Sequence, residues 1–432
     1  MIDRIMSRAF QISALACCIR VAGAQTPSAT TPIPPPQVLF PVGTAPSNGD
    51  QNPYGIAFVP FQVPVGGTSG LNTNFNPGDI LISNFNNGQN AQGTGNLQGL
   101  GTTITRIQST GLTSTFYQTT TAMAQSTGQP GVGLTNALVC LQNGMVIVGS
   151  LPTTDGTFAT ASAGSLLFIR RDGALSTSII YQPSATGGVL RQTSLGFVNN
   201  AFFLNANVIN GPWSLAVNDL GNSAQLFLSN VLTGTVVRFH VTFDSDGNGV
   251  VFDETPIYLT TGLNHENDAN GFLLGPSGLA YDPLPSSPTQ DTLFIASSKD
   301  NAVYMIQGAG WNQGPTAPQL LVLDTAHLRG PLGVALAPNG NLYVANSDGN
   351  NADQNVPSKN PSEIELYDSV AGTYLGQFSV DPNNGGAFAV AFQSLTSITR
   401  PGRRANTVTP VARFAAVNDN QVVLNLWTLF FN

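Results

Sequence analysis

The sequence predicts an all-β protein: a six-bladed β-propeller of four-stranded blades, with the last blade closed by an N-terminal strand. Three observations lead to this prediction: groups of short apolar runs recur along the chain, helix-forming residues are scarce, and the C-terminus lacks one run that the N-terminus supplies. Charged residues make up 9% of the 432 residues, whereas hydrophobic residues make up 41%. That composition is sufficient for a large core and suits uncharged β surfaces with many turns.

The N-terminus has the features of an export signal. Arg4 and Arg8 precede a mostly apolar run, and Ala22-Gly23-Ala24 provides small residues before a predicted cleavage site. We therefore expect residues 1–24 to be removed and the protein to be secreted or periplasmic. Lipidation of Cys17 is the alternative. The apolar run is too short to span a bilayer, and no later run is long enough.

A linker separates this signal from the fold. Residues 25–36, QTPSATTPIPPP, are rich in Pro and Thr and should be extended. Residues 37–432 then form a single propeller domain. The mature chain keeps one cysteine, Cys140, so it has no internal disulfide and depends on its core for stability.

The first two strands of each blade are the clearest repeat. GPLGVALAP at 330 matches GPSGLAYDP at 275, GPWSLAVND at 211 and NPYGIAFVP at 52. Each copy precedes an apolar run that ends in small polar residues, such as LYVANS at 342. Weaker copies begin near 133 and 386. Continuous apolar runs suit inner strands that are buried on both faces.

The outer strands complete the blades. A third run follows each pair, such as EIELYD at 363, and often a fourth, such as QLLVLD at 319. The sixth unit has no fourth run, but QVLF at 37 matches QLLV at 319, so the N-terminus should supply that strand and remove a free edge. Asn339-Gly340 and Asn143-Gly144 read as two-residue hairpin turns in which both residues have positive φ.

The repeat resembles that of NHL-type and gluconolactonase/regucalcin-like six-bladed propellers, and the whole chain is similar to exported bacterial members. The resemblance rests on GPxG-(L/V)A followed by NLYVANS, and it extends over nearly all of 37–427. It implies the fold but not one function, because propellers host hydrolases, lyases, isomerases and binding scaffolds. Gluconolactonase-like enzymes use a carboxylate-bearing calcium site at the channel mouth, whereas the corresponding strand ends here are mainly Asn and Ser.

The loops at one face are the expected functional site. In this architecture the loops into the first strands and after the second strands open together, at the mouth of the central channel. Six strand-end residues should ring this mouth: Asn84, Ser150, Asn230, Ser298, Asn346 and Asn418. They could bind a small ligand or a hard metal ion through oxygen atoms, or they could simply bond the backbone at turns.

Two of the three histidines lie in these loops. His265 is close to Glu266 and Asp268, and His327 is close to Arg329 in the loop of the next blade. Together with a carboxylate, the two histidines could hold a transition metal, or they could stabilise the loops. His265, Glu266, His327 and Arg329 are therefore the candidate catalytic residues.

The segment DSDGNGVVFDET, 244–255, imitates a calcium-binding loop. Asp244, Asp246 and Asn248 occupy the first, third and fifth positions, but Thr255 stands where a bidentate Glu is required. A surface calcium site and a plain hairpin both remain open. Calcium or a transition metal is thus the only cofactor considered, and neither is firmly indicated.

Charge excludes some partners. The net charge is −8, and no basic run occurs, so we expect no nucleic-acid binding. We expect a monomeric exported scaffold that binds a small molecule or a protein through the loops at the channel mouth. The alternative is a metal-dependent, lactonase-like hydrolase or lyase with its site at the channel, so whether the chain is an enzyme stays open.

Overall fold

The structure is a computed structural model. It describes residues 40–63, 74–87, 97–119, 132–161, 163–184, 187–194, 208–244, 250–252, 256–268, 272–283, 290–347, 363–383, 385–401 and 406–431. The chain divides into the compact units Met1–Thr31 and Pro32–Asn432, and every described residue belongs to the second. Within the described part, no helix has the length and apolarity needed to cross a bilayer.

The first three blades are antiparallel sheets whose strands follow one another from the inside outwards. Blade I contains β2 (Asp50–Phe58), β3 (Ile80–Asn87), β4 (Thr103–Ile107) and β5 (Thr113–Gln118). Blade II contains β6 (Leu134–Cys140), β7 (Val146–Ser150), β8 (Ser165–Ile169) and β9 (Leu175–Ser184), extended by β10 (Gly187–Ser194), and carries the 3-10 helix η1 (Phe158–Thr160). Blade III contains β11 (Pro212–Asp219), β12 (Ser223–Asn230) and β13 (Thr235–Phe243), with β14 (Val250–Phe252) and β15 (Ile257–Thr260) both paired to β13.

The other three blades have the same plan. A hairpin of β16 (Glu266–Asp268) and β17 (Phe272–Leu274) precedes blade IV, which contains β18 (Pro276–Asp282), β19 (Thr292–Ser297), β20 (Ala302–Gln307) and β21 (Gln319–Leu323). Blade V contains β22 (Pro331–Leu336), β23 (Asn341–Asn346), β24 (Glu363–Asp368) and β25 (Tyr374–Ser379). Blade VI contains β26 (Ala387–Pro401), β27 (Asn406–Asn418), β28 (Val423–Phe430) and β1 (Phe40–Gly43).

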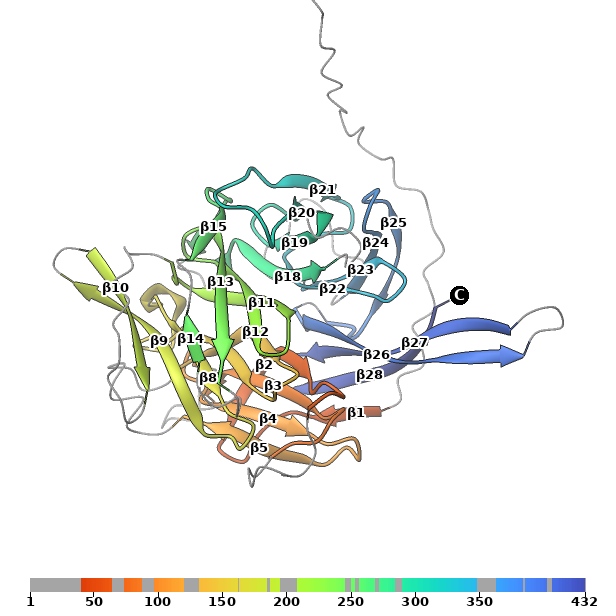
Figure 1. Cartoon of the computed structure of the whole chain (residues 1–432), viewed down its shortest axis with the longest axis horizontal. Helices are drawn as coiled ribbons and strands as arrows, with labels where there is room; N and C mark the ends of the chain where they lie inside the picture. Colours follow the sequence, from red (N-terminus) through yellow and green to blue (C-terminus); the bar gives the residue numbers. More distant parts are fainter. Residues whose placement is uncertain are drawn as a thin grey trace, which may run out of the picture. The chain divides into compact units, whose positions relative to one another are not determined.

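The six inner strands form a ring (Figure 1). Strands β2, β6, β11, β18, β22 and β26 contact one another in that order, and β26 contacts β2 again. They begin within a few residues of the positions at which the sequence repeats begin. The predicted six-bladed β-propeller is therefore confirmed.

The ring is closed by the N-terminal strand, as predicted. Strand β1 pairs antiparallel with β28, from Phe40 opposite Leu426 to Gly43 opposite Val423 (Figure 1). Blade VI therefore combines three strands from the C-terminal end with one from the start of the chain. This arrangement covers the β28 edge that would otherwise be free to pair with another chain.

The core consists of apolar layers between neighbouring blades. Strand β23 shows the principle: Leu342 and Val344 belong to the layer between blades IV and V, whereas Tyr343 and Ala345 belong to the layer between blades V and VI. The second strand of the blade therefore buries both of its faces, which confirms the interpretation of the continuous apolar run LYVA.

The hairpin turns differ from the prediction. Gly340 and Gly144 have positive φ angles of 83° and 88°, but the asparagines before them do not. The Gly340 amide donates to the Ala337 carbonyl at 2.9 Å, and the Ala337 amide donates to the Asn341 carbonyl at 2.8 Å. The loop therefore has three residues, a turn followed by a glycine bulge, and the two-residue prediction was wrong. Pro338 presets the first turn position, so only the glycine needs a positive φ.

Candidate functional site

Each inner strand is irregular at its mouth end. The pairing with the second strand shifts directly after the motif proline, between Pro53 and Gly55 in blade I and between Pro331 and Gly333 in blade V. The same shift occurs in blades III and IV, and larger ones occur in blades II and VI. A residue in such a bulge leaves the ladder and can turn its side chain towards a new neighbour. The residues at these shifts include Tyr54, Trp213, Ser277, Leu332 and Phe388.

Aromatic bulge residues fill the centre of the propeller. Tyr54 stacks on Phe388 with ring centroids 4.4 Å apart and on Phe85 at 4.8 Å, and it meets Trp213 edge-on at 5.7 Å. Leu332 belongs to the same cluster, and all five side chains are buried. We call Tyr54, Phe85, Trp213, Leu332 and Phe388 the channel plug. The predicted polar ring therefore has an apolar centre.

A hydrogen bond crosses this centre. Asn136 Nδ2 of blade II donates to the Leu332 carbonyl of blade V at 3.3 Å. These blades are three steps apart in a ring of six, so they face each other across the axis. Side chains and backbone thus close the channel between opposite blades.

The glycine after the bulge explains the GPxG motif. A Cβ atom on Gly333 would lie 2.5 Å from the Phe388 carbonyl oxygen, and one on Gly278 would lie 2.8 Å from the Val334 nitrogen. Neighbouring inner strands therefore approach too closely for a side chain at this position. The motif reflects packing around the axis, and it carries no chemistry of its own.

The strand-end asparagines hold the loops that lead into the inner strands. Asn230 accepts a hydrogen bond from the Asn210 amide at 2.9 Å and donates to the Val208 carbonyl at 3.0 Å. Asn346 repeats this with the Arg329 amide at 2.6 Å and the His327 carbonyl at 2.7 Å. Blades III, V and VI each have an asparagine at this strand-end position. All three side chains are fully buried: Asn230, Asn346 and Asn418.

The remaining strand-end residues have related contacts. Asn418 donates to Asp381 Oδ2 at 3.2 Å, and Ser150 donates to the Val132 carbonyl. Ser298 accepts from the Gly275 amide at 3.1 Å. In blade IV the residue that pairs with the inner-strand proline is Ser297. Ser298 therefore lies one residue beyond the equivalent strand-end position of the other blades.

Asn84 is the exception among these residues. Its amide nitrogen donates to the Thr103 carbonyl and the Thr105 hydroxyl at 3.2 and 3.0 Å. Its Oδ1 atom is buried and has no partner among the described residues. A ligand-binding role for the six strand-end residues stays a prediction, and their observed contacts are with the protein itself.

His265 and Glu266 lie beside the mouth turn of blade IV. The neighbouring Asn264 donates to Asp300 at 2.7 Å, and Glu266 forms an ion pair with Lys299. The His265 side chain is exposed, and its Nδ1 atom lies 3.0 Å from the Leu263 carbonyl.

His327 lies against the outer strands of blade V. Its ring stacks on Tyr374 of β25 at 3.8 Å, and Nδ1 lies 2.7 Å from Asp324 Oδ2. Burial alone would raise the pKa of Asp324, but the hydrogen bond and the charge of His327 lower it below the ordinary value. Arg329 is buried.

No cluster suited to a metal ion occurs in the described part of the chain, where no three His, Cys, Asp or Glu residues come together. The Asp268 side chain, Asp246 and Asn248 lie outside the described residues. Asp244 is described and exposed. The two predicted metal sites therefore stay predictions.

Sequence reasoning missed a polar group beside the plug. Asp419 follows Asn418 in the turn between β27 and β28, and its Oδ1 atom is buried without a partner among the described residues. Burial raises the pKa of Asp419 to about 7. Burial also raises the pKa of Tyr54, the negative charge of Asp419 raises it further, and a hydrogen bond with Asn52 opposes this. The sequence did offer a signal for this group. Asp419 directly follows the strand-end residue of blade VI, where blades I and III have the apolar residues Phe85 and Val231.

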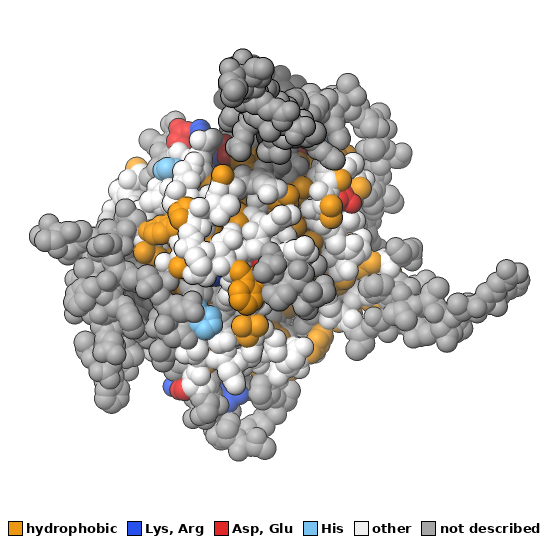
Figure 2. Space-filling view, turned by 45° about the horizontal axis from the view of Figure 1, so that its top comes forward, with side chains coloured by type: hydrophobic (Ala, Val, Ile, Leu, Met, Phe, Trp, Pro, Cys, Tyr) orange, Lys and Arg blue, Asp and Glu red, His pale blue; other side chains and the backbone are white. Residues whose placement is uncertain are grey.

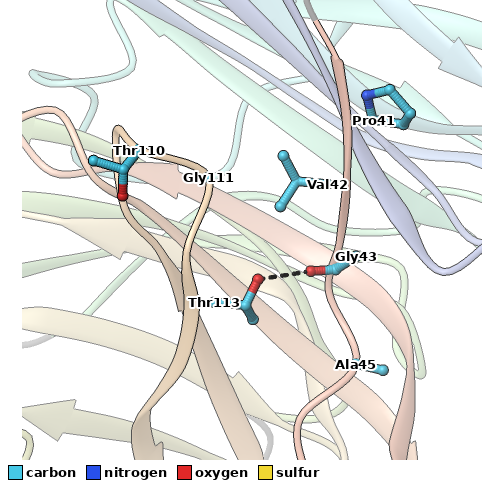
Figure 3. Close-up of a pocket in the computed structure, with 7 residues that line it drawn as sticks. All are labelled: Pro41, Val42, Gly43, Ala45, Thr110, Gly111 and Thr113. Carbon is cyan, nitrogen blue, oxygen red and sulfur yellow. Dashed lines mark hydrogen bonds between the residues drawn. The ribbon is translucent and has the colours of Figure 1, made fainter.

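A shallow pocket of about 500 Å³ lies elsewhere, between β1 and the β4–β5 turn (Figure 3). The Thr113 hydroxyl donates to the Gly43 carbonyl at 3.0 Å within it. Its lining has no charged residue and consists of Pro41, Val42, Gly43, Ala45, Thr110, Gly111 and Thr113. It offers no group for acid–base chemistry or metal binding.

Comparisons with known proteins do not assign this chain to a family. No family model matches the chain, and no curated protein matches it significantly. A gluconolactonase from Xanthomonas campestris is 11% identical, with 93% of this chain and 99% of that chain covered and a TM-score of 0.43. The α-L-arabinofuranosidase Arb93A from Fusarium graminearum is 11% identical, with 91% and 98% covered and a TM-score of 0.47. A PQQ-bound aldose sugar dehydrogenase from Streptomyces coelicolor is 15% identical, with 91% and 98% covered and a TM-score of 0.44. The sheet topology of the chain itself shows that it is a six-bladed β-propeller.

Proposed function

We propose that this propeller is an exported scaffold that binds a small molecule or another protein through the loops at the channel mouth. The observation that carries the proposal is the closed channel. Since Asn136 reaches Leu332 across the axis and aromatic rings pack around them, a partner would contact the loops above the plug. Loops on a rigid scaffold are common binding sites.

The low charge fits this proposal. Figure 2 shows one face on which uncharged and hydrophobic side chains cover most of the described surface, with few Lys, Arg, Asp and Glu side chains. Recognition would therefore depend on hydrogen bonds and apolar contact. The metal-dependent hydrolase or lyase stays a prediction, and no observation favours it as a second proposal.

The three tryptophans provide a test. Trp213 belongs to the plug, Trp311 is 58% exposed on blade IV, and Trp427 is buried in blade VI. We would label the mature protein with 5-fluorotryptophan, screen a fragment library by fluorine NMR, and assign the three signals with single Trp→Phe variants.

Ligands of the mouth should shift the Trp213 signal and leave the Trp311 signal unchanged. The proposal would be contradicted if every fragment that binds shifts only Trp311, or if no fragment or added protein changes Trp213.

A further inference from the structure

The connection between the third and fourth strands is unusually long in blade IV, where it consists of residues 308–318. In blades I, II and V the same connection is shorter and consists of residues 108–112, 170–174 and 369–373. In blade IV it begins after Gln307, which pairs with Thr292 at the opposite end of the blade from Ser297 and the mouth. We call residues 308–318 the blade IV insert. The propeller plan does not require its length, so the insert needs an explanation of its own.

Trp311 is the most prominent side chain of the blade IV insert. It is 58% exposed, although tryptophan is highly buried on average in folded proteins. Asn312 and Gln313 follow it, and the sequence has no Lys, Arg, His, Asp or Glu between Asn301 and Leu323. The insert therefore presents an apolar ring and amide groups on an uncharged stretch of chain.

Polar side chains from two blades hold Gly310, the residue before Trp311. Gln225 of blade III donates to the Gly310 carbonyl at 2.9 Å, and the Gly310 amide donates to Asp291 Oδ2 of blade IV at 2.6 Å. A Cβ atom on Gly310 would lie 3.0 Å from both Gln225 Oε1 and the Tyr281 hydroxyl. Gly310 is thus enclosed by side chains that leave little room for a substituent.

The residues on either side of this glycine are fixed as well. Arg238 of blade III is buried, and its Nη1 atom donates to the Ala309 carbonyl at 2.7 Å. The Trp311 amide donates to the Gly308 carbonyl at 2.9 Å. Burial of charged groups costs free energy, and here the buried charges of Arg238 and Asp291 both act on the insert. A backbone held in this way loses little conformational entropy when Trp311 binds a ligand.

The amide groups beside the indole keep acceptor capacity. Asn312 Nδ2 donates to the Gln307 carbonyl at 3.2 Å, and Gln313 Nε2 donates to the Trp311 carbonyl at 3.0 Å. No described residue donates to the side-chain oxygen of either amide. Both oxygens therefore remain available to accept hydrogen bonds from hydroxyl groups of a ligand.

We propose that Trp311 is the centre of a binding site for a neutral carbohydrate chain. A pyranose ring has a flat face of C–H groups that packs on an indole ring, and its edge carries hydroxyl groups that donate to amide oxygens. The uncharged surroundings favour a neutral sugar over an acidic one. A β-1,4-linked glucose chain fits best, because its hydroxyl groups are equatorial and both ring faces carry C–H groups. The site lies at the other end of blade IV from the mouth, so the inference is independent of the proposed function.

The test titrates the protein, labelled with 5-fluorotryptophan, with cellopentaose. The fluorine signal of Trp311 should shift until it saturates, whereas the signals of Trp213 and Trp427 should stay in place. Sorbitol, which has hydroxyl groups but no ring, should cause no shift. A pentamer of β-1,4-linked glucuronate, which adds a carboxylate to each ring, should bind more weakly, and binding as tight as that of cellopentaose would contradict the neutral ligand.

Variants are compared by calorimetric titration with cellopentaose, because they need no fluorine label. Trp311→Ala should weaken binding at least about tenfold, and Trp311→Phe should retain part of it. Gly310→Ala should also weaken binding, since the added Cβ displaces the backbone that positions the indole. Leu323→Ala removes another exposed apolar side chain of blade IV and should leave the affinity unchanged.

Two results overturn the inference directly: a Trp311 signal that cellopentaose does not shift, or equal affinity of wild type and Trp311→Ala. A Trp311 signal that shifts with an added protein but with no sugar would assign the insert to protein contact and overturn it too. The Trp213 signal reports on the mouth in the same spectra. The inference and the proposed function can therefore fail separately.

Discussion

Asn136 donates a hydrogen bond to the Leu332 carbonyl from the opposite side of the propeller, at 3.3 Å. The two residues are far apart in the chain and belong to blades II and V. Their contact joins the inner strands across the axis, in addition to the contacts around the ring. A central bond of this kind resists the separation of blades as well as closing the channel.

Asn136→Ala should lower the free energy of unfolding by about 1 kcal/mol, the usual net contribution of one hydrogen bond. It should also raise the rate of local opening at the mouth, because Leu332 of the plug loses its hydrogen bond to the opposite blade. Urea unfolding and hydrogen exchange of the Leu332 region measure the two effects. Asn222→Ala, at an exposed turn, serves as the control, and equal behaviour of the two variants would contradict the prediction.

Two glycines should respond differently to the same substitution. Gly333→Ala places a Cβ 2.5 Å from the Phe388 carbonyl oxygen, so two inner strands must move apart at a cost of about 3 kcal/mol. Gly340 has a φ of 83° and open space around it, so Gly340→Ala should cost about 1 kcal/mol. Chemical denaturation of both variants compares them. A larger loss at Gly340 would show that close packing does not explain the GPxG motif.

The repeat made most of the fold predictable. Runs such as LYVANS recur with the same neighbours, so blade number, strand order and the closing strand could be inferred without a structure. Turn geometry could not, because Asn-Gly fits more than one loop, and the effect of Pro338 depends on the register of both strands.

The site was less predictable. The sequence places Asn230 and Asn346 at strand ends, but their burial and their bonds to loop backbone depend on the path of a loop far from them in the chain. The plug was missed because it depends on bulges that remove Tyr54 and Trp213 from the ladder. Hydrophobic patterns do not reveal a one-residue shift in pairing.

The closing strand should be essential for stability. Val42 of β1 is buried against the core of blades I and VI, whereas Ala45 just beyond the strand is exposed. Val42→Asp should destabilise the protein by about 3 kcal/mol or more, because it buries a charge and loosens β1 from β28. Ala45→Asp should change little. Thermal unfolding and size-exclusion chromatography compare the pair, and equal melting temperatures would argue against closure by β1.

Val422 and Asn301 occupy the same position before the third strand, and both have positive φ, 54° and 51°. Blade III has Gly234 there, with a φ of 62°. Val422→Gly should stabilise the protein by roughly 0.5–1 kcal/mol, since relief of strain exceeds the added chain entropy. Asn301→Gly should destabilise it, because Asn301 Oδ1 accepts a hydrogen bond from the Gly330 amide at 2.7 Å. Urea denaturation should give shifts of opposite sign, and shifts of the same sign would refute this explanation.

The buried carboxyl of Asp419 should make stability depend on pH. Its pKa is about 7 in the folded protein and near 3.8 in the unfolded chain, so between these values the folded state holds a proton that unfolding releases. Stability from this group is therefore fully present below about pH 4 and is lost as the pH rises to 7, with a slope of at most about 1.4 kcal/mol per pH unit. Asp419→Asn cannot ionise, so the variant should be more stable than wild type at pH 8 and nearly equal to it at pH 4. Urea midpoints measured across this range give the difference between the two proteins, which cancels the contributions of Asp324 and Asp381. Parallel curves would mean that Asp419 is solvated in the folded state and would contradict its burial.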